Sequence, residues 1–264
     1  MLARIALAAL VVAAMPTCTE RGGSPVNGDG DSPPPAAGDA ASITEQLIRS
    51  HITVIAHDSM RGRRTPSAGL DRTAEYIAGR FASLELKPGG DDGSFIQRYG
   101  VPMQPETRAP NVVAILEGSD PALKGQYVVF SAHMDHVGVG APVAGDSIYN
   151  GADDNASGTA AVLALANAFA NSSTRPRRSL IFLTVSGEEE GLWGSAYFAT
   201  HPPVPLDSMV AALNIDMIGR NWRDTIVAIG REHSDLGTTL DSVATKHREL
   251  GMTPIDDPWP NERF

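Results

Sequence analysis

The sequence predicts an α/β fold, with a mixed, mostly parallel central sheet and helices on both of its faces. Two observations lead to this prediction. Short apolar runs, rich in β-branched residues and bounded by turn residues, recur along the chain and are typical of strands buried on both faces. Segments with helical periodicity alternate with them, as in a sheet that is covered on both sides. The predicted strands are 111–116, 127–133, 179–186, 211–217 and 225–230.

Five helical segments accompany these strands. The first, 42–59, has Ser42 as its N-cap and Glu45 three residues later, which together form a capping box. The second, 70–86, is amphipathic and ends at a Pro-Gly pair. Ser157 is predicted to cap the third. The remaining helices are predicted at 157–170, 191–200 and 234–250.

Residues 1–18 have the features of a secretory signal peptide. Arg4 gives a positive start, and 5–15 form an apolar run that is too short to span a bilayer as a helix. Two outcomes are open for the mature protein: cleavage near Ala14, or lipid attachment at Cys18, the only cysteine. Either one predicts an exported protein, in the periplasm, the cell envelope or the medium, with membrane contact only through a lipid on Cys18.

The segment 19–41 is rich in Gly, Pro, Ser and Asp, which is typical of a flexible linker. One folded domain is therefore predicted at 42–264, and 264 residues with 42% apolar content can bury a sizeable core. The chain has 21 basic and 31 acidic residues, a formal net charge of −10 and no long basic stripe. We therefore expect no nucleic-acid partner.

Polar side chains follow three of the predicted strands at the point where each strand ends. They are His133, Asp135, Glu188, Glu189 and Asp216. In open α/β sheets, ligands bind outside the carboxyl ends of the strands. We therefore expect these side chains to meet at one edge of the sheet, together with Asp153 and Asp154, which precede the third predicted helix.

Several carboxylates in one place repel one another unless a cation lies among them. A histidine with several carboxylates suits zinc or a similar divalent ion, and the absence of cysteine argues against a closed structural zinc site. Open, carboxylate-rich sites with two metals are used for hydrolysis. Each residue also has an ordinary explanation, such as a solvated helix start for Glu188 and Glu189. If all of these ordinary explanations were correct, four unrelated polar features would have to occur at strand ends by chance. A metal site is therefore the stronger hypothesis.

Four segments resemble the motifs of a known enzyme family. They are SAHMDHVG (131–138), YNGADDNASG (149–158), SGEEEGLWGSAYF (186–198) and LNIDMIG (213–219). In order and spacing they resemble the dinuclear zinc aminopeptidases, the group that contains bacterial leucyl aminopeptidases and aminopeptidase Y. The likeness extends from about Arg61 to the last residue, and it implies the fold of the zinc exopeptidases.

The resemblance implies a set of metal ligands for two zinc ions. His133 and Asp216 match ligands of the first zinc, Glu189 matches a ligand of the second, and Asp154 matches the carboxylate that bridges both. A cis peptide bond between Asp154 and Asn155 is also implied. Asp153 is not expected to be a ligand, and His136 is expected to be a spacer.

The resemblance also implies catalytic roles and a reaction. Glu188 matches the general base, and Asp135 matches the carboxylate that orients His133. The implied reaction is hydrolysis of the peptide bond after an N-terminal residue, in which zinc polarises the scissile carbonyl and Glu188 moves the proton from water to the leaving amine. The expected partners are peptides with a free N-terminus, whose amino group the metal-site carboxylates would hold.

The sequence departs from the family at one ligand. The family supplies a late histidine to the second zinc, well after the motif that contains Asp216, and no residue of this sequence matches it. The second site then has only Asp154 and Glu189, with His233 as a conceivable substitute. We therefore expect the domain to lack its C-terminal portion. Two alternatives stay open: a non-catalytic or inactive truncated domain, and a carboxypeptidase-like or glutaminyl cyclase-like relative on the same fold.

Overall fold

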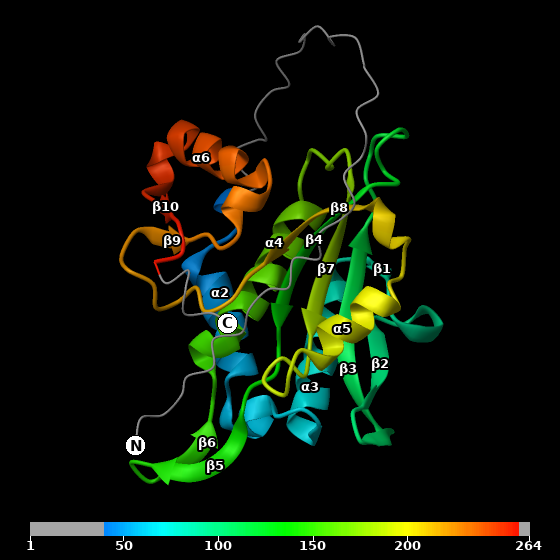
Figure 1. Ribbon diagram of the computed structural model, residues 1–264, viewed down its shortest axis with the longest axis vertical. Helices are drawn as coiled ribbons and strands as arrows, with labels where there is room; N and C mark the ends of the chain where they lie inside the picture. The colour runs from blue at the N-terminus through cyan, green and yellow to red at the C-terminus, as the bar shows by residue number, and fades with distance from the viewer. Residues whose placement is uncertain (1–39, 259–264) are drawn as a thin grey trace, which may run out of the picture.

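The computed structural model describes residues 40–258, which form a six-stranded mixed sheet with helices on both faces (Figure 1). The predicted fold class is confirmed. The predicted signal peptide, all of the linker but its last two residues, and the final six residues lie outside the described part. Among the described residues, no helix is long and apolar enough to cross a membrane.

The central sheet has the strand order β1, β3, β7, β4, β8, and β2 also pairs with β3. Strand β4 runs parallel to β7 and β8, whereas β1, β2 and β7 run antiparallel to β3. Parallel pairing is therefore less extensive than predicted, since β3 pairs antiparallel with all of its neighbours. For β2 the reason is local: a tight turn joins it to β3, and such a turn produces an antiparallel pair. The bounds are β1 Lys87–Pro88, β2 Ile96–Val101, β3 Gln104–Leu116, β4 Tyr127–His133, β7 Ser179–Val185 and β8 Met209–Asn214.

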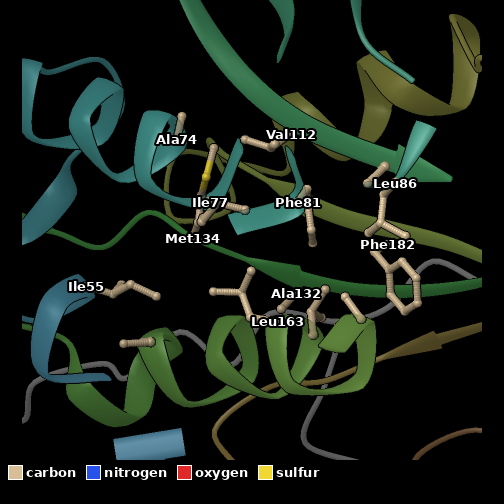
Figure 2. Packing of buried hydrophobic residues seen from close by; sticks show 14 of the residues in the cluster. Ile55, Ala74, Ile77, Phe81, Leu86, Val112, Ala132, Met134, Leu163 and Phe182 are labelled. Carbon is tan, nitrogen blue, oxygen red and sulfur yellow. The ribbon is translucent and has the colours of Figure 1, made fainter. Parts of the chain in front are cut away.

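Alternate residues of β3 and β7 point to opposite faces of the sheet and build two apolar layers. On one face, Val112 and Phe182 pack against helices α2 (Glu45–Ile55), α3 (Ala68–Ser83) and α4 (Gly158–Ala170), and Figure 2 shows this layer between the helices and the strands. On the other face, Val113 and Ile181 pack with Phe198 of α5 (Trp193–Thr200). The central strands are therefore buried on both sides, as their continuous apolar runs predict.

The helices of the described chain are α2 Glu45–Ile55, α3 Ala68–Ser83, α4 Gly158–Ala170, α5 Trp193–Thr200 and α6 Leu236–Lys246. Two predicted caps are wrong. Thr44, not Ser42, caps α2: it has an extended backbone, and its hydroxyl accepts from Leu47 N at 3.2 Å. Ser157 has a helical backbone, and its hydroxyl donates to the Asp153 carbonyl instead. A capping side chain needs an extended residue directly before the first turn, and neither serine provides one.

Two small sheets lie beside the central one. The antiparallel hairpin of β5 (Gly138–Val143) and β6 (Asp146–Tyr149) projects from the body of the molecule (Figure 1). Strand β9 (Thr225–Val227) pairs in parallel with β10 (Thr253–Ile255), so the predicted strand 225–230 is shorter than expected and lies outside the central sheet. Strand β8 is also more exposed than predicted, because within the described residues it pairs only with β4.

Candidate metal centre

The carboxyl ends of β7, β4 and β8 lie next to one another and carry most of the candidate residues. His133 is the last residue of β4 and lies opposite Val185, the last residue of β7. Glu188 and Glu189 come three and four residues after the end of β7, and Asp216 comes two residues after the end of β8. The three strands are parallel, so their polar side chains reach the same edge of the sheet.

Asn155 joins the segment that carries Asp154 to the segment that carries Asp216. The side-chain amide Nδ2 of Asn155 donates to the carbonyl of Ile215 at 3.0 Å. Its Oδ1 accepts from the backbone N–H of Gly158, the first residue of α4, at 2.8 Å. The start of α4 and the end of β8 are thus held side by side. The Asp154–Asn155 peptide bond is cis, as the resemblance implied.

His133 is buried among three carboxylates, with 3% of its side chain exposed. Its Nε2 lies 3.2 Å from Asp154 Oδ1 and 3.4 Å from Asp216 Oδ1, and its Nδ1 lies 3.6 Å from Asp135 Oδ1. Burial by itself would lower the pKa of His133, but the carboxylates outweigh it and hold the pKa well above its usual value. The donor atoms of His133, Asp154 and Asp216 all lie within 4.8 Å of one another.

Asp135 is fully buried and links His133 to the loop after β7. Its Oδ2 accepts from Thr65 Oγ1 at 3.0 Å and from Gly187 N at 2.8 Å, and its Oδ1 accepts from Glu188 N at 3.4 Å. A carboxylate held in this way can fix the orientation of a neighbouring imidazole. His133 Nδ1, at 3.6 Å from Asp135 Oδ1, has no hydrogen-bond partner among the described residues, so the orienting role of Asp135 stays a prediction.

A second histidine completes another group of three donors. His136 Nδ1 lies 2.7 Å from Glu189 Oε1 and 3.9 Å from Asp154 Oδ2. The donor atoms of His136, Asp154 and Glu189 also lie within 4.8 Å of one another. This differs from the expectation that His136 is a spacer. Asp154 belongs to both groups, because its Oδ1 faces His133 and its Oδ2 faces His136.

Glu188 lies beside these groups and belongs to neither. Burial raises its pKa to about 7, and the nearby negative charges of Glu189, Asp135 and Asp216 act in the same direction, against the opposing effect of His133. Its Oε1 is buried and has no hydrogen-bond partner among the described residues. A carboxyl group with a pKa near neutrality can both accept and release a proton under ordinary conditions.

The residues fit a divalent cation. Buried polar atoms are almost always hydrogen-bonded, yet Asp216 Oδ1 is buried with no hydrogen-bond partner in the described chain. Each of the two groups combines one imidazole nitrogen with carboxylate oxygens, a donor set that suits zinc and similar ions. His133 is buried, but the other residues of both groups are only partly buried, so the site is open to solvent as a catalytic metal site requires.

Two other candidates lie outside both groups. Asp153, which was not expected to be a ligand, accepts from Gly219 N at 2.7 Å through its Oδ1. His233, the conceivable substitute for the late histidine, has 63% of its side chain exposed and lies 3.3 Å from Glu232. Neither residue contributes to a group of potential metal ligands in the described part of the chain.

Arg63, which the sequence does not single out as a site residue, is completely buried near the site. Its guanidinium donates to four backbone carbonyls, those of Ile55, Met134, Asn150 and Gly151. Met134 lies between His133 and Asp135 in the chain, and Gly151 lies three residues before Asp154. Arg63 therefore holds two ligand-bearing loops together. The Arg-rich segment 61–64 was the only sequence signal, and it is equally typical of an exposed loop.

Comparisons with known proteins agree with this geometry. The model of "Peptidase family M28" matches residues 111–257. A protein of Leptosphaeria maculans named "Probable zinc metalloprotease" is 28% identical over 192 residues, which are 70% of this chain and 43% of that protein. The chain thus spans less than half the length of this curated relative.

Two solved structures share the fold. LapA aminopeptidase of Legionella pneumophila superposes with a TM-score of 0.62 at 21% identity, over 83% of this chain and 56% of that one. BSAP, a zinc aminopeptidase from Bacillus subtilis, superposes with a TM-score of 0.58 at 15% identity, over 81% of this chain and 87% of that one. At these identities the likeness is one of fold.

Proposed function

Because the chain belongs to peptidase family M28, we propose that it is a zinc-dependent aminopeptidase domain that hydrolyses the peptide bond after the N-terminal residue of a peptide. The observation that carries this proposal is the pair of donor groups that share Asp154, with Glu188 beside them. The names of the relative and of the two structures agree with a zinc peptidase.

In this proposal the chain holds two zinc ions. His133, Asp154 and Asp216 would hold the first, and Asp154 and Glu189 would contribute to the second. Zinc, when bound in such a site, polarises a carbonyl group and lowers the pKa of a water molecule. Asp135 is proposed to orient the imidazole of His133 through Nδ1, so that Nε2 faces the first zinc.

Glu188 is proposed to move the proton in this reaction. Its raised pKa allows it to take a proton from the attacking water and to donate that proton to the leaving amine. The carboxylates of the site, which carry excess negative charge, would attract the free amino group of the substrate. Peptides with a free N-terminus are therefore the proposed substrates.

The test is an assay of the zinc-loaded chain on matched peptides. We expect release of the N-terminal residue from a peptide with a free amino group, and no cleavage of the same peptide after N-acetylation. Cleavage of only the acetylated peptide would overturn the aminopeptidase proposal. Ring closure of an N-terminal glutamine with loss of ammonia would support the cyclase-like alternative, and zinc binding without any turnover would support the non-catalytic one.

We also propose that the protein is exported. Support comes from the short positive start and the apolar run at 5–15, followed by a polar segment. The intact mass of the protein recovered from the cell envelope and the medium tests this. A chain that starts just after Ala14 and carries no acyl increment would indicate cleavage, and an acyl increment on Cys18 would indicate a lipoprotein. Recovery of the uncleaved chain in the cytosol would contradict export.

A further inference from the structure

We infer that Arg64 binds the C-terminal carboxylate of a dipeptide substrate, so that the site favours dipeptides with a free C-terminus over their C-terminal amides. The inference rests on the proposed function, because it names a narrower substrate class for the same site. Arg64 is an exposed member of the Arg-rich segment 61–64, and the metal-binding groups do not include it.

Arg64 connects two loops at the rim of the donor group that contains His136 and Glu189. Its Nε donates to Glu190 Oε1 at 2.8 Å, and Glu190 directly follows Glu189 in the chain. The stem of Arg64 packs against Gly138, two residues after His136, where an added Cβ atom would lie 2.7 Å from Arg64 Cβ and 3.4 Å from its Cδ. The guanidinium is therefore held beside this donor group.

The guanidinium of Arg64 keeps donors for a second carboxylate. It carries N–H groups on Nε, Nη1 and Nη2 in a planar fork, and within the described chain Glu190 contacts only Nε. The side chain of Arg64 is 62% exposed, so a ligand can reach it. Arg63 differs, because its guanidinium is buried and donates to backbone carbonyls. A free fork of this kind can bind a carboxylate through two parallel hydrogen bonds.

The charges of the site explain why a dipeptide needs such a partner. The carboxylates that attract the amino group of the substrate repel its C-terminal carboxylate. In a dipeptide this carboxylate lies only about 3.5 Å, the length of one residue, beyond the scissile carbonyl, and it therefore stays close to the site. A cation at the rim offsets the repulsion, and Arg64 provides one. In a longer peptide the carboxylate lies farther away, so the preference belongs to short substrates.

A simpler role for Arg64 is to tie its own loop to the loop after β7 through Glu190. Loss of that ion pair would affect the acid and the amide of a peptide to the same extent. Recognition of a carboxylate affects only the acid. The amide carries one more positive charge than the acid, so the carboxylates of the site would by themselves favour the amide. Removal of Arg64 therefore separates the two roles.

The experiment compares leucylglycine with leucylglycinamide as substrates of the zinc-loaded wild-type chain, Arg64→Gln and Arg61→Gln. In the wild type we expect a KM about tenfold lower for the acid, since hydrogen bonds to a charged group are strong. The kcat values should be similar, because this contact is the same before and during the reaction. In Arg64→Gln the preference for the acid should disappear, with unchanged kinetics on the amide. Arg61→Gln, the matched control, removes the same charge from an exposed position of the same segment and should keep the preference.

A second readout needs no turnover. Calorimetry measures the affinity of both compounds for zinc-loaded Glu188→Gln, and we expect about the same tenfold preference for the acid. The double variant Glu188→Gln/Arg64→Gln should bind the acid no more tightly than the amide. Circular dichroism checks that each variant is folded.

The outcomes separate this inference from the proposed function. Equal values for acid and amide in the wild type, a preference that persists in Arg64→Gln, or an equal loss on both compounds in that variant would overturn the role of Arg64 and leave the peptidase proposal intact. No turnover of either compound by the wild type would contradict the peptidase proposal, while the calorimetric comparison would still decide whether Arg64 binds the carboxylate.

Discussion

Arg63 Nε donates to the carbonyl oxygen of Met134 at 2.9 Å, directly between His133 and Asp135 in the chain. The same guanidinium donates to the carbonyls of Asn150 and Gly151, which precede Asp154. Burial lowers the pKa of Arg63 to about 10, and the charges of Asp135, Asp154 and Glu189 oppose this effect, so that the group stays charged near neutral pH. A buried cation thus joins two loops of the site through backbone atoms.

Arg63→Lys is expected to destabilise the protein. A lysine ammonium has no planar fork and cannot donate to all four carbonyls, so buried acceptors would lose their partners. The free energy of unfolding should fall by about 3 kcal/mol in urea denaturation without metal. The control is Arg61→Lys, at an exposed position of the same segment, which should stay within about 0.5 kcal/mol of the wild type. Equal stability of the two variants would contradict the role assigned to Arg63.

Asp135→Asn is expected to weaken zinc binding by about 10–100-fold, because the amide keeps the shape of the carboxylate but loses its charge next to His133. Calorimetric titration with zinc measures the change. Asp207→Asn, at an exposed position, is the control and should bind zinc as the wild type does. An unchanged affinity in Asp135→Asn would show that His133 needs no charged partner.

Glu188→Gln is expected to lower kcat by about 10²–10⁴-fold on a peptide with a free N-terminus, because glutamine cannot accept the proton from water. The number of bound zinc ions should not change, since Glu188 belongs to neither donor group. Glu190→Gln is the control: this neighbour pairs with Arg64 at 2.8 Å and should keep wild-type kcat. Near-normal turnover by Glu188→Gln would show that Glu188 is not the general base.

His51 is expected to make the protein less stable in acid. Burial, helped by the positive charge of Arg80, lowers the pKa of His51 to about 4 in the folded state, whereas the unfolded chain titrates near 6.5. Between these values the unfolded state binds more protons, so the contribution is fully present above pH 6.5 and is lost as the pH falls to about 4.

The measurement is the free energy of unfolding of metal-free protein at pH 7 and pH 4. The wild type should lose roughly 2 kcal/mol more than His51→Gln over this interval. His247→Gln, an exposed histidine with 43% of its side chain accessible, is the control and should follow the wild type. Parallel curves for the wild type and His51→Gln would contradict the prediction. His51 also bonds Tyr76 Oη at 2.8 Å, a contact that glutamine can replace.

The fold class was predictable because the apolar runs at 111–116, 127–133 and 179–186 correspond to strands buried on both faces. The exposure of β8 and the position of 225–227 outside the central sheet were not predictable, because an apolar run does not specify its neighbours. The two predicted N-caps were wrong for a related reason. A serine caps a helix only where it lies directly before the first turn with an extended backbone, and the path of the folded chain determines where that is.

For the site, the order of residues was enough to show which side chains are present and that they follow strand ends. The resemblance of the motifs implied that His133, Asp154 and Asp216 belong together, and the structure places their donor atoms within 4.8 Å of one another. The folded chain was needed to place His136 beside Glu189, 53 residues later in the chain, and Arg63 against the carbonyl of Met134. Side chains that touch across loops depend on loop paths and ring orientations, which no local pattern of residues encodes.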